Sequence, residues 1–112
     1  MKKSKKSLMF LFAGAIALAG SSLYAQKGDA KAGKEVFENN CSVCHNSDST
    51  EVKMGPGLKG ISKRAKMTTT GKAPTDANLI EKISTGGNGM PAYADILSAE
   101  EKANVIAYLK TL

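Results

Sequence analysis

Apolar residues recur at helical spacing in three segments of the chain. The first segment spans residues 29–41, with Asp29 as its predicted N-cap. One face carries, at positions i, i+3, i+4 and i+7, the residues Gly33, Val36, Phe37 and Asn40. A glycine inside a helix costs about 1 kcal/mol relative to alanine. Gly33 therefore indicates that another backbone approaches this helix closely.

The clearest helix is predicted over residues 98–112. Ser98 and Glu101 have the three-residue spacing of a capping box. The same spacing of i, i+3, i+4 and i+7 gives an apolar stripe of Val105, Tyr108, Leu109 and Leu112. The simplest architecture packs this helix across the first one through the two apolar faces.

A shorter helix is predicted between these two. It starts at Thr75 or Asp76 and ends at Gly86, and its apolar positions are Leu79, Ile80 and Ile83. Residues 58–63 can add one or two turns, and residues 66–74 have the composition of a loop. Because no segment shows the alternation of a strand, the sequence predicts an all-α fold of three to four short helices.

The first 25 residues have a different pattern. Four lysines precede an apolar run from Leu8 to Ala19, and a polar break then leads to Ala25. A charged start, a short apolar run and a small residue at a cleavage site are typical of a signal peptide. The run is too short to cross easily a hydrocarbon core of roughly 30 Å. We expect a cleaved signal peptide over residues 1–25, a mature domain over residues 26–112 and a periplasmic protein, with an uncut anchor as the alternative.

Residues 41–45 carry the candidate chemistry. They read Cys-Ser-Val-Cys-His, and C-x-x-C-H is the attachment sequence for c-type haem. Two thiols add to the two vinyl groups of one haem edge, so Cys41 and Cys44 must lie on adjacent turns. His45 follows directly and is thereby carried under the ring, where its imidazole can bind the iron. A small domain also gains from such a large apolar cofactor, since its own core is modest.

Three other interpretations of the cysteine pair fit less well. A thioredoxin-like redox pair follows a strand, and no strand is predicted before Cys41. A structural zinc site needs four ligands, whereas Cys41, Cys44 and the only histidine supply three. A disulfide across so short a loop would stabilise the fold little.

A methionine is the expected sixth ligand, because His45 is the only histidine. Met90 lies in Gly-Gly-Asn-Gly-Met-Pro, where glycines permit a tight path beside a flat ring and the proline fixes the following backbone. Met54 comes only ten residues after Cys44, and Met67 lies in a polar loop. We therefore predict His45 and Met90 as the two iron ligands.

The segment Gly-Pro-Gly-Leu at residues 55–58 has a predicted role beside His45. An iron-binding histidine is normally oriented by a hydrogen bond from its second ring nitrogen. We expect the carbonyl of Pro56 to accept this bond and Leu58 to press on the haem face. An ordinary proline–glycine turn is the alternative.

Taken in order, these motifs resemble the class I cytochromes c. The residues that carry the resemblance are Gly33, Phe37, Cys41, Cys44, His45, Gly55, Pro56, Leu58, Gly89, Met90, Pro91 and the segment 105–109. The resemblance implies an all-α fold wrapped around one covalent haem c, His/Met ligation and electron transfer without enzymatic activity. The rival interpretations are a haem enzyme or gas sensor with a labile sixth ligand, and a haem domain of a larger membrane complex.

Charge adds a hypothesis about partners. The net charge of +6 falls to +2 when the four lysines of residues 1–25 leave, so nothing indicates nucleic-acid binding. Residues 53–72 nevertheless contain six basic residues and no acidic one. We expect a monomer whose basic segment steers it to acidic patches on redox partners, and which meets a membrane only through partner complexes. A merely solvated basic loop is the alternative.

Overall fold

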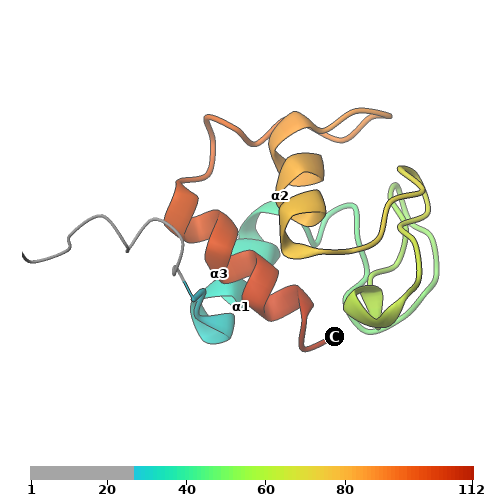
Figure 1. The fold of residues 1–112 in the computed structure, drawn as a ribbon, viewed down its shortest axis with the longest axis horizontal. Helices are drawn as coiled ribbons and strands as arrows, with labels where there is room; N and C mark the ends of the chain where they lie inside the picture. Colours follow the sequence, from blue (N-terminus) through green and yellow to red (C-terminus); the bar gives the residue numbers. More distant parts are fainter. Residues whose placement is uncertain (1–26) are drawn as a thin grey trace, which may run out of the picture.

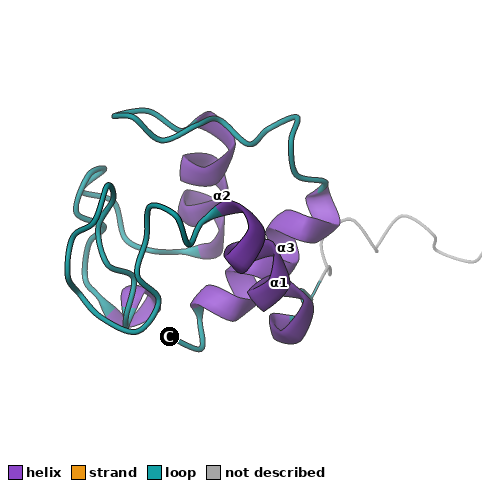
Figure 2. Cartoon of the chain, turned by 180° about the vertical axis from the view of Figure 1, so that it is seen from behind, coloured by secondary structure: helices purple, strands orange, loops and turns teal. Residues whose placement is uncertain are grey.

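The computed structural model describes residues 27–112 (Figure 1), so the predicted signal peptide lies outside the described residues. Three α-helices and one 3-10 helix form, and no strand forms among these residues (Figure 2). The elements in order are α1 (Ala30–Asn40), η2 (Ile61–Lys63), α2 (Asp76–Thr85) and α3 (Ala99–Leu109). The predicted all-α class is thus confirmed. In the same part of the chain, no helix has the length and apolar character needed to span a membrane.

Helices α1 and α3 cross, and α2 packs beside α3 (Figure 1). A Cβ atom on Gly33 would lie 1.8 Å from the backbone oxygen of Asn104, so only glycine fits this crossing. The rings of Phe37 and Tyr108 pack with their centroids 5.4 Å apart. The predicted close approach at Gly33 and the predicted crossing of the two helices are both confirmed.

Each of the three α-helices starts directly after a residue whose side chain caps it. Asp29 accepts a hydrogen bond from the Lys31 amide, and Thr75 accepts one from the Asn78 amide. Ser98 and Glu101 form the predicted capping box. Helix α3 ends at Leu109 rather than at residue 112, because the last residues turn more tightly with i to i−3 hydrogen bonds.

The core gathers residues from all three helices and from the loops between them. Its buried members are Val36, Phe37, Ile61, Met67, Leu79, Ile83, Leu97, Val105, Ile106 and Leu109. Met67 corrects an expectation, because its segment is a loop but its side chain is only 7% exposed. Hydrogen bonds from the Met67 amide to Lys72 and from the Gly71 amide to Met67 close this loop on itself. The loop is therefore compact and contributes to the core.

Candidate functional site

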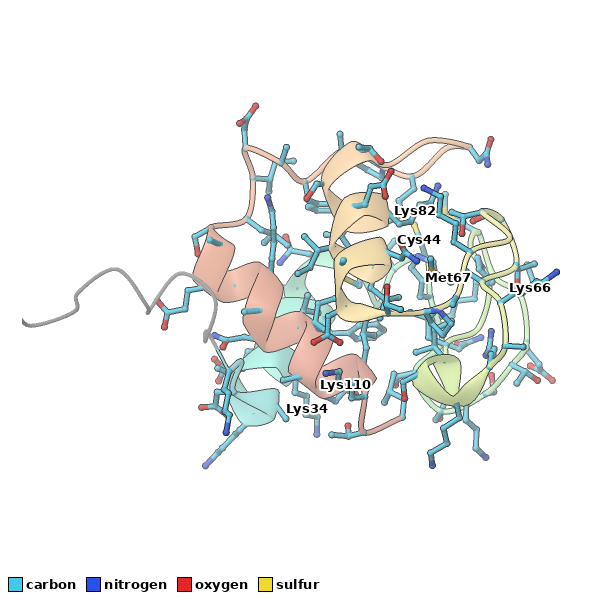
Figure 3. The ribbon with its side chains drawn as sticks, viewed as in Figure 1. Lys34, Cys44, Lys66, Met67, Lys82 and Lys110 are labelled. Atoms are coloured by element: carbon cyan, nitrogen blue, oxygen red, sulfur yellow. The ribbon has the colours of Figure 1, made fainter. Side chains whose placement is uncertain are left out.

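The chain continues past α1 as a tight turn that presents the two cysteines and the histidine. The amides of Cys44 and His45 both donate to the Cys41 carbonyl, at 3.1 and 2.9 Å. All three side chains line one cavity of about 310 Å³. Figure 3 shows Cys44 between α2 and the loops that follow α1. The structure thus brings the three predicted attachment residues to a single cavity.

The ring of His45 is held on one side by the loop at Gly55 and Pro56. Its Nδ1 lies 2.8 Å from the Pro56 carbonyl oxygen, which is the contact expected from the sequence. Because a carbonyl only accepts, Nδ1 carries the proton and Nε2 keeps a free lone pair. A Cβ on Gly55 would lie 2.5 Å from Cε1 of the ring, so the glycine lets the loop pack directly against it.

Both cysteines are free and partly buried. Burial raises the pKa of the Cys41 thiol to about 11, and the neighbouring Cys44 adds to the rise. Cys41 therefore stays protonated near neutral pH, the form least prone to oxidation. No cluster of three or more histidine, cysteine or carboxylate ligands that could hold a metal ion forms within residues 27–112.

Met90 is placed by a two-residue hairpin turn. The amide and carbonyl of Gly87 pair with those of Met90, at 3.0 and 3.1 Å. Asn88 and Gly89 between them have φ values of 53° and 86°, the left-handed pair of a type I′ turn. Met90 is half-buried and lines the cavity. The glycine-rich segment therefore fixes the backbone that presents this thioether.

The other two methionines of the described residues, Met54 and Met67, also border the cavity, and they differ in burial. Met54 is 81% exposed, and its sulfur lies 3.9 Å from the Cys44 sulfur. Met67 is buried, and Figure 3 shows it close to Cys44 in projection. The polar composition of its loop argues against Met67 as a ligand when the sequence is considered alone. Its burial beside the cavity makes it the competitor that experiments on Met90 must address.

Several lining residues were not predicted from the sequence. Leu58 lies at the cavity as expected, but Arg64, Lys82 and Tyr93 join it. Arg64 donates to the carbonyls of Gly57 and Lys59, and Lys82 donates to the carbonyl of Gly86. Periodicity gave no indication of these residues, since two lie in loops and Lys82 lies on the polar side of its helix.

The residues around the cavity fit a haem. Two thiols suit its vinyl groups, and an imidazole with a free Nε2 and a half-buried thioether suit its iron. Two cations, Arg64 and Lys82, suit its carboxylates. Aliphatic walls suit the flat apolar ring, and they are formed by Leu58, Ile61, Leu79 and Ile83.

Comparisons with known proteins agree with this fit. A family model described as "Cytochrome C oxidase, cbb3-type, subunit III" matches residues 28–109. Cytochrome c6 of Rippkaea orientalis is 36% identical over 85 residues, which cover 76% of this chain and 72% of that protein. A cytochrome c-553-like protein of Synechocystis sp. is 32% identical over 93 residues, covering 82% and 77%. The solved structure of cytochrome c6 from the diatom Phaeodactylum tricornutum superposes with a TM-score of 0.60 at 32% identity, covering 75% of this chain and 93% of that one.

Proposed function

The chain belongs to the class I cytochrome c family and carries one covalently attached haem c, from which we propose that it is an exported one-electron carrier and not an enzyme. In this proposal Cys41 and Cys44 form the two thioether bonds, and His45 and Met90 bind the iron. The mature domain begins near residue 26, after removal of a signal peptide in the periplasm. N-terminal sequencing of the exported protein tests that start, and an uncut N-terminus would favour a membrane-attached haem domain.

The observation that carries the proposal is the orientation of the His45 ring, which a hydrogen bond to Pro56 sets. The Pro56 carbonyl accepts a hydrogen bond from the protonated Nδ1, so the lone pair of Nε2 is free to bind a metal. The loop at Gly55 packs closely against the ring, and the hydrogen bond to Pro56 sets the orientation of the ring. The chain thus presents an oriented nitrogen ligand beside two thiols.

The chemistry that haem supplies when bound is reversible one-electron oxidation of its iron. The residues of the chain hold the ring, orient the imidazole and exclude water through the aliphatic walls of the cavity. A thioether ligand raises the reduction potential relative to a second nitrogen ligand. If His45 and Met90 both bound the iron, they would leave it no open position for a substrate, and one-electron transfer would be the activity that fits.

Partner docking is proposed on the surface near the attachment sequence. Among the described residues, Lys59, Lys63 and Lys66 are exposed and form no salt bridge, whereas Lys72 pairs with Glu81 at 3.3 Å. Figure 3 shows Lys66 extending away from the body of the molecule. Within residues 43–54, large apolar side chains are also exposed, and they are Val43, Val52 and Met54. A redox partner that offers both acidic and apolar groups matches these features.

A haem enzyme or gas sensor is the second candidate, because Met90 is only half-buried and an external ligand could displace a weakly bound thioether. Carbon monoxide added to the reduced protein and cyanide added to the oxidised protein separate the two candidates. A carrier with both axial positions filled binds these ligands slowly and weakly. Rapid binding of either ligand would instead favour the enzyme or sensor.

A further inference from the structure

Tyr93 joins two segments that lie far apart in the sequence. Its hydroxyl donates a hydrogen bond of 2.9 Å to the backbone carbonyl of Asn40, across a separation of 53 residues. Asn40 is the last residue of α1 and directly precedes Cys41. Tyr93 follows Met90 by three residues, and Cys41 and Met90 line the same cavity. The bond therefore connects the attachment segment with the loop that carries the proposed sixth ligand.

The Asn40 carbonyl needs this partner. Backbone acceptors in the last turn of a helix lack the amide that would continue the helix. The amides of Cys44 and His45 both turn to the Cys41 carbonyl instead. Within residues 27–112 no backbone amide donates to Asn40, so the Tyr93 hydroxyl satisfies an acceptor that is half-buried.

The backbone of Tyr93 is itself anchored. Its amide donates to the Ile83 carbonyl in the last full turn of α2 at 2.9 Å, and its carbonyl accepts from the Leu97 amide at 3.1 Å. The ring packs against the buried core. Only Pro91 and Ala92 separate this anchor from Met90, and both are exposed. Tyr93 is thus the nearest fixed point on the C-terminal side of Met90, as the hairpin to Gly87 is on the other side.

We infer that Tyr93 is a positioning residue, whose hydroxyl holds the Met90 loop against the end of α1 and so keeps the Met90 thioether on the iron. The inference rests on the proposed ligation by Met90. Without the hydroxyl, the loop moves away from α1 without breaking a hydrogen bond. An external ligand then competes with Met90 more easily, although the haem stays attached.

The test is an imidazole titration of the oxidised, haem-loaded protein, followed by the weak far-red sulfur–iron band. Tyr93→Phe removes only the hydroxyl oxygen. The expected result is about tenfold tighter apparent binding of imidazole, equivalent to about 1.4 kcal/mol, which lies within the range for the loss of one hydrogen bond. Tyr108→Phe is the matched control, because Tyr108 is also half-buried but its hydroxyl makes no hydrogen bond within residues 27–112. Its affinity for imidazole should stay within about twofold of the original.

The unchanged protein is measured first, which separates this inference from the proposed function. If it lacks the far-red band, ligation by Met90 is wrong and the role given to Tyr93 falls with it. If the band is present and Tyr93→Phe binds imidazole as the original does, the inference alone is overturned. An equal effect of Tyr108→Phe, or loss of covalent haem in Tyr93→Phe, also overturns it, because the hydroxyl would then serve the fold or the attachment.

Discussion

Replacing Gly55 with alanine places a methyl group against the ring of His45. The added Cβ would lie 2.5 Å from Cε1 and 2.9 Å from Nδ1 of the ring, so the atoms would overlap. The ring cannot turn away freely, because its Nδ1 donates to the Pro56 carbonyl at 2.8 Å. The loop must move, and because Pro56 follows Gly55 directly, its carbonyl moves too and the hydrogen bond to the ring weakens or breaks.

Both responses lower the free energy of unfolding. Overpacking of a tight site costs about 1–3 kcal/mol, and loss of a hydrogen bond costs about 0.5–1.5 kcal/mol. We expect Gly55→Ala to lose about 2–4 kcal/mol of stability in the haem-loaded protein. This is a large share of the roughly 5–15 kcal/mol that holds a domain together, but it leaves the protein folded.

Guanidinium unfolding, followed by circular dichroism and by haem absorbance, measures this loss. Gly60→Ala is the control, because nothing lies within 4 Å of its added Cβ and its φ of 71° is strained for any side chain. Gly60→Ala should lower the free energy of unfolding by only about 1–2 kcal/mol, the cost of a side chain in the left-handed conformation, and leave the haem spectrum unchanged. If Gly55→Ala costs no more than Gly60→Ala and also leaves the spectrum unchanged, the contact does not orient His45 and the reasoning is refuted.

Three further predictions concern the methionines, the last helix and the basic surface. Met90→Ala should abolish the far-red sulfur–iron band. Met67→Leu should keep the band and lower the free energy of unfolding by less than about 1.5 kcal/mol, since the side-chain volume is conserved. The opposite pattern would make Met67 the ligand. Ser98→Ala should remove the capping box and lower the free energy of unfolding by about 1 kcal/mol, seen as a lower thermal midpoint, and an unchanged midpoint would contradict this role. Electron transfer to an acidic redox partner should slow as salt is added, and the double variant Lys63→Glu and Lys66→Glu should be slower at low salt; rates independent of salt would remove the steering hypothesis.

The elements that were predictable from the sequence are those with local determinants. Capping residues such as Asp29 and Ser98 set the helix starts, and they act within three residues of the chain. The attachment sequence is equally local, because adjacent turns must present both thiols. The close approach at Gly33 was predictable because a glycine inside a helix lowers stability unless a neighbouring backbone packs against it.

The parts that were missed depend on contacts between distant segments. Tyr93 meets Asn40 only after the loops have folded, and no local pattern encodes that pairing. Met67 was placed in a polar loop, and its burial follows from how that loop closes on itself. The i, i+3, i+4, i+7 pattern does not include Ile106, which is buried in the structure, because the buried face of a packed helix spans more than about 100°.

The measurement that tests the central claim most directly is the visible spectrum of the purified protein, oxidised and reduced, after denaturing extraction of free haem. We predict that the haem stays with the chain, that the reduced spectrum is c-type, and that the oxidised protein shows the weak far-red sulfur–iron band. Retained haem without that band would contradict the proposed ligation by Met90. Complete loss of haem, in protein produced by a host able to attach it, would contradict the covalent cytochrome itself and return Cys41 and Cys44 to thiol chemistry.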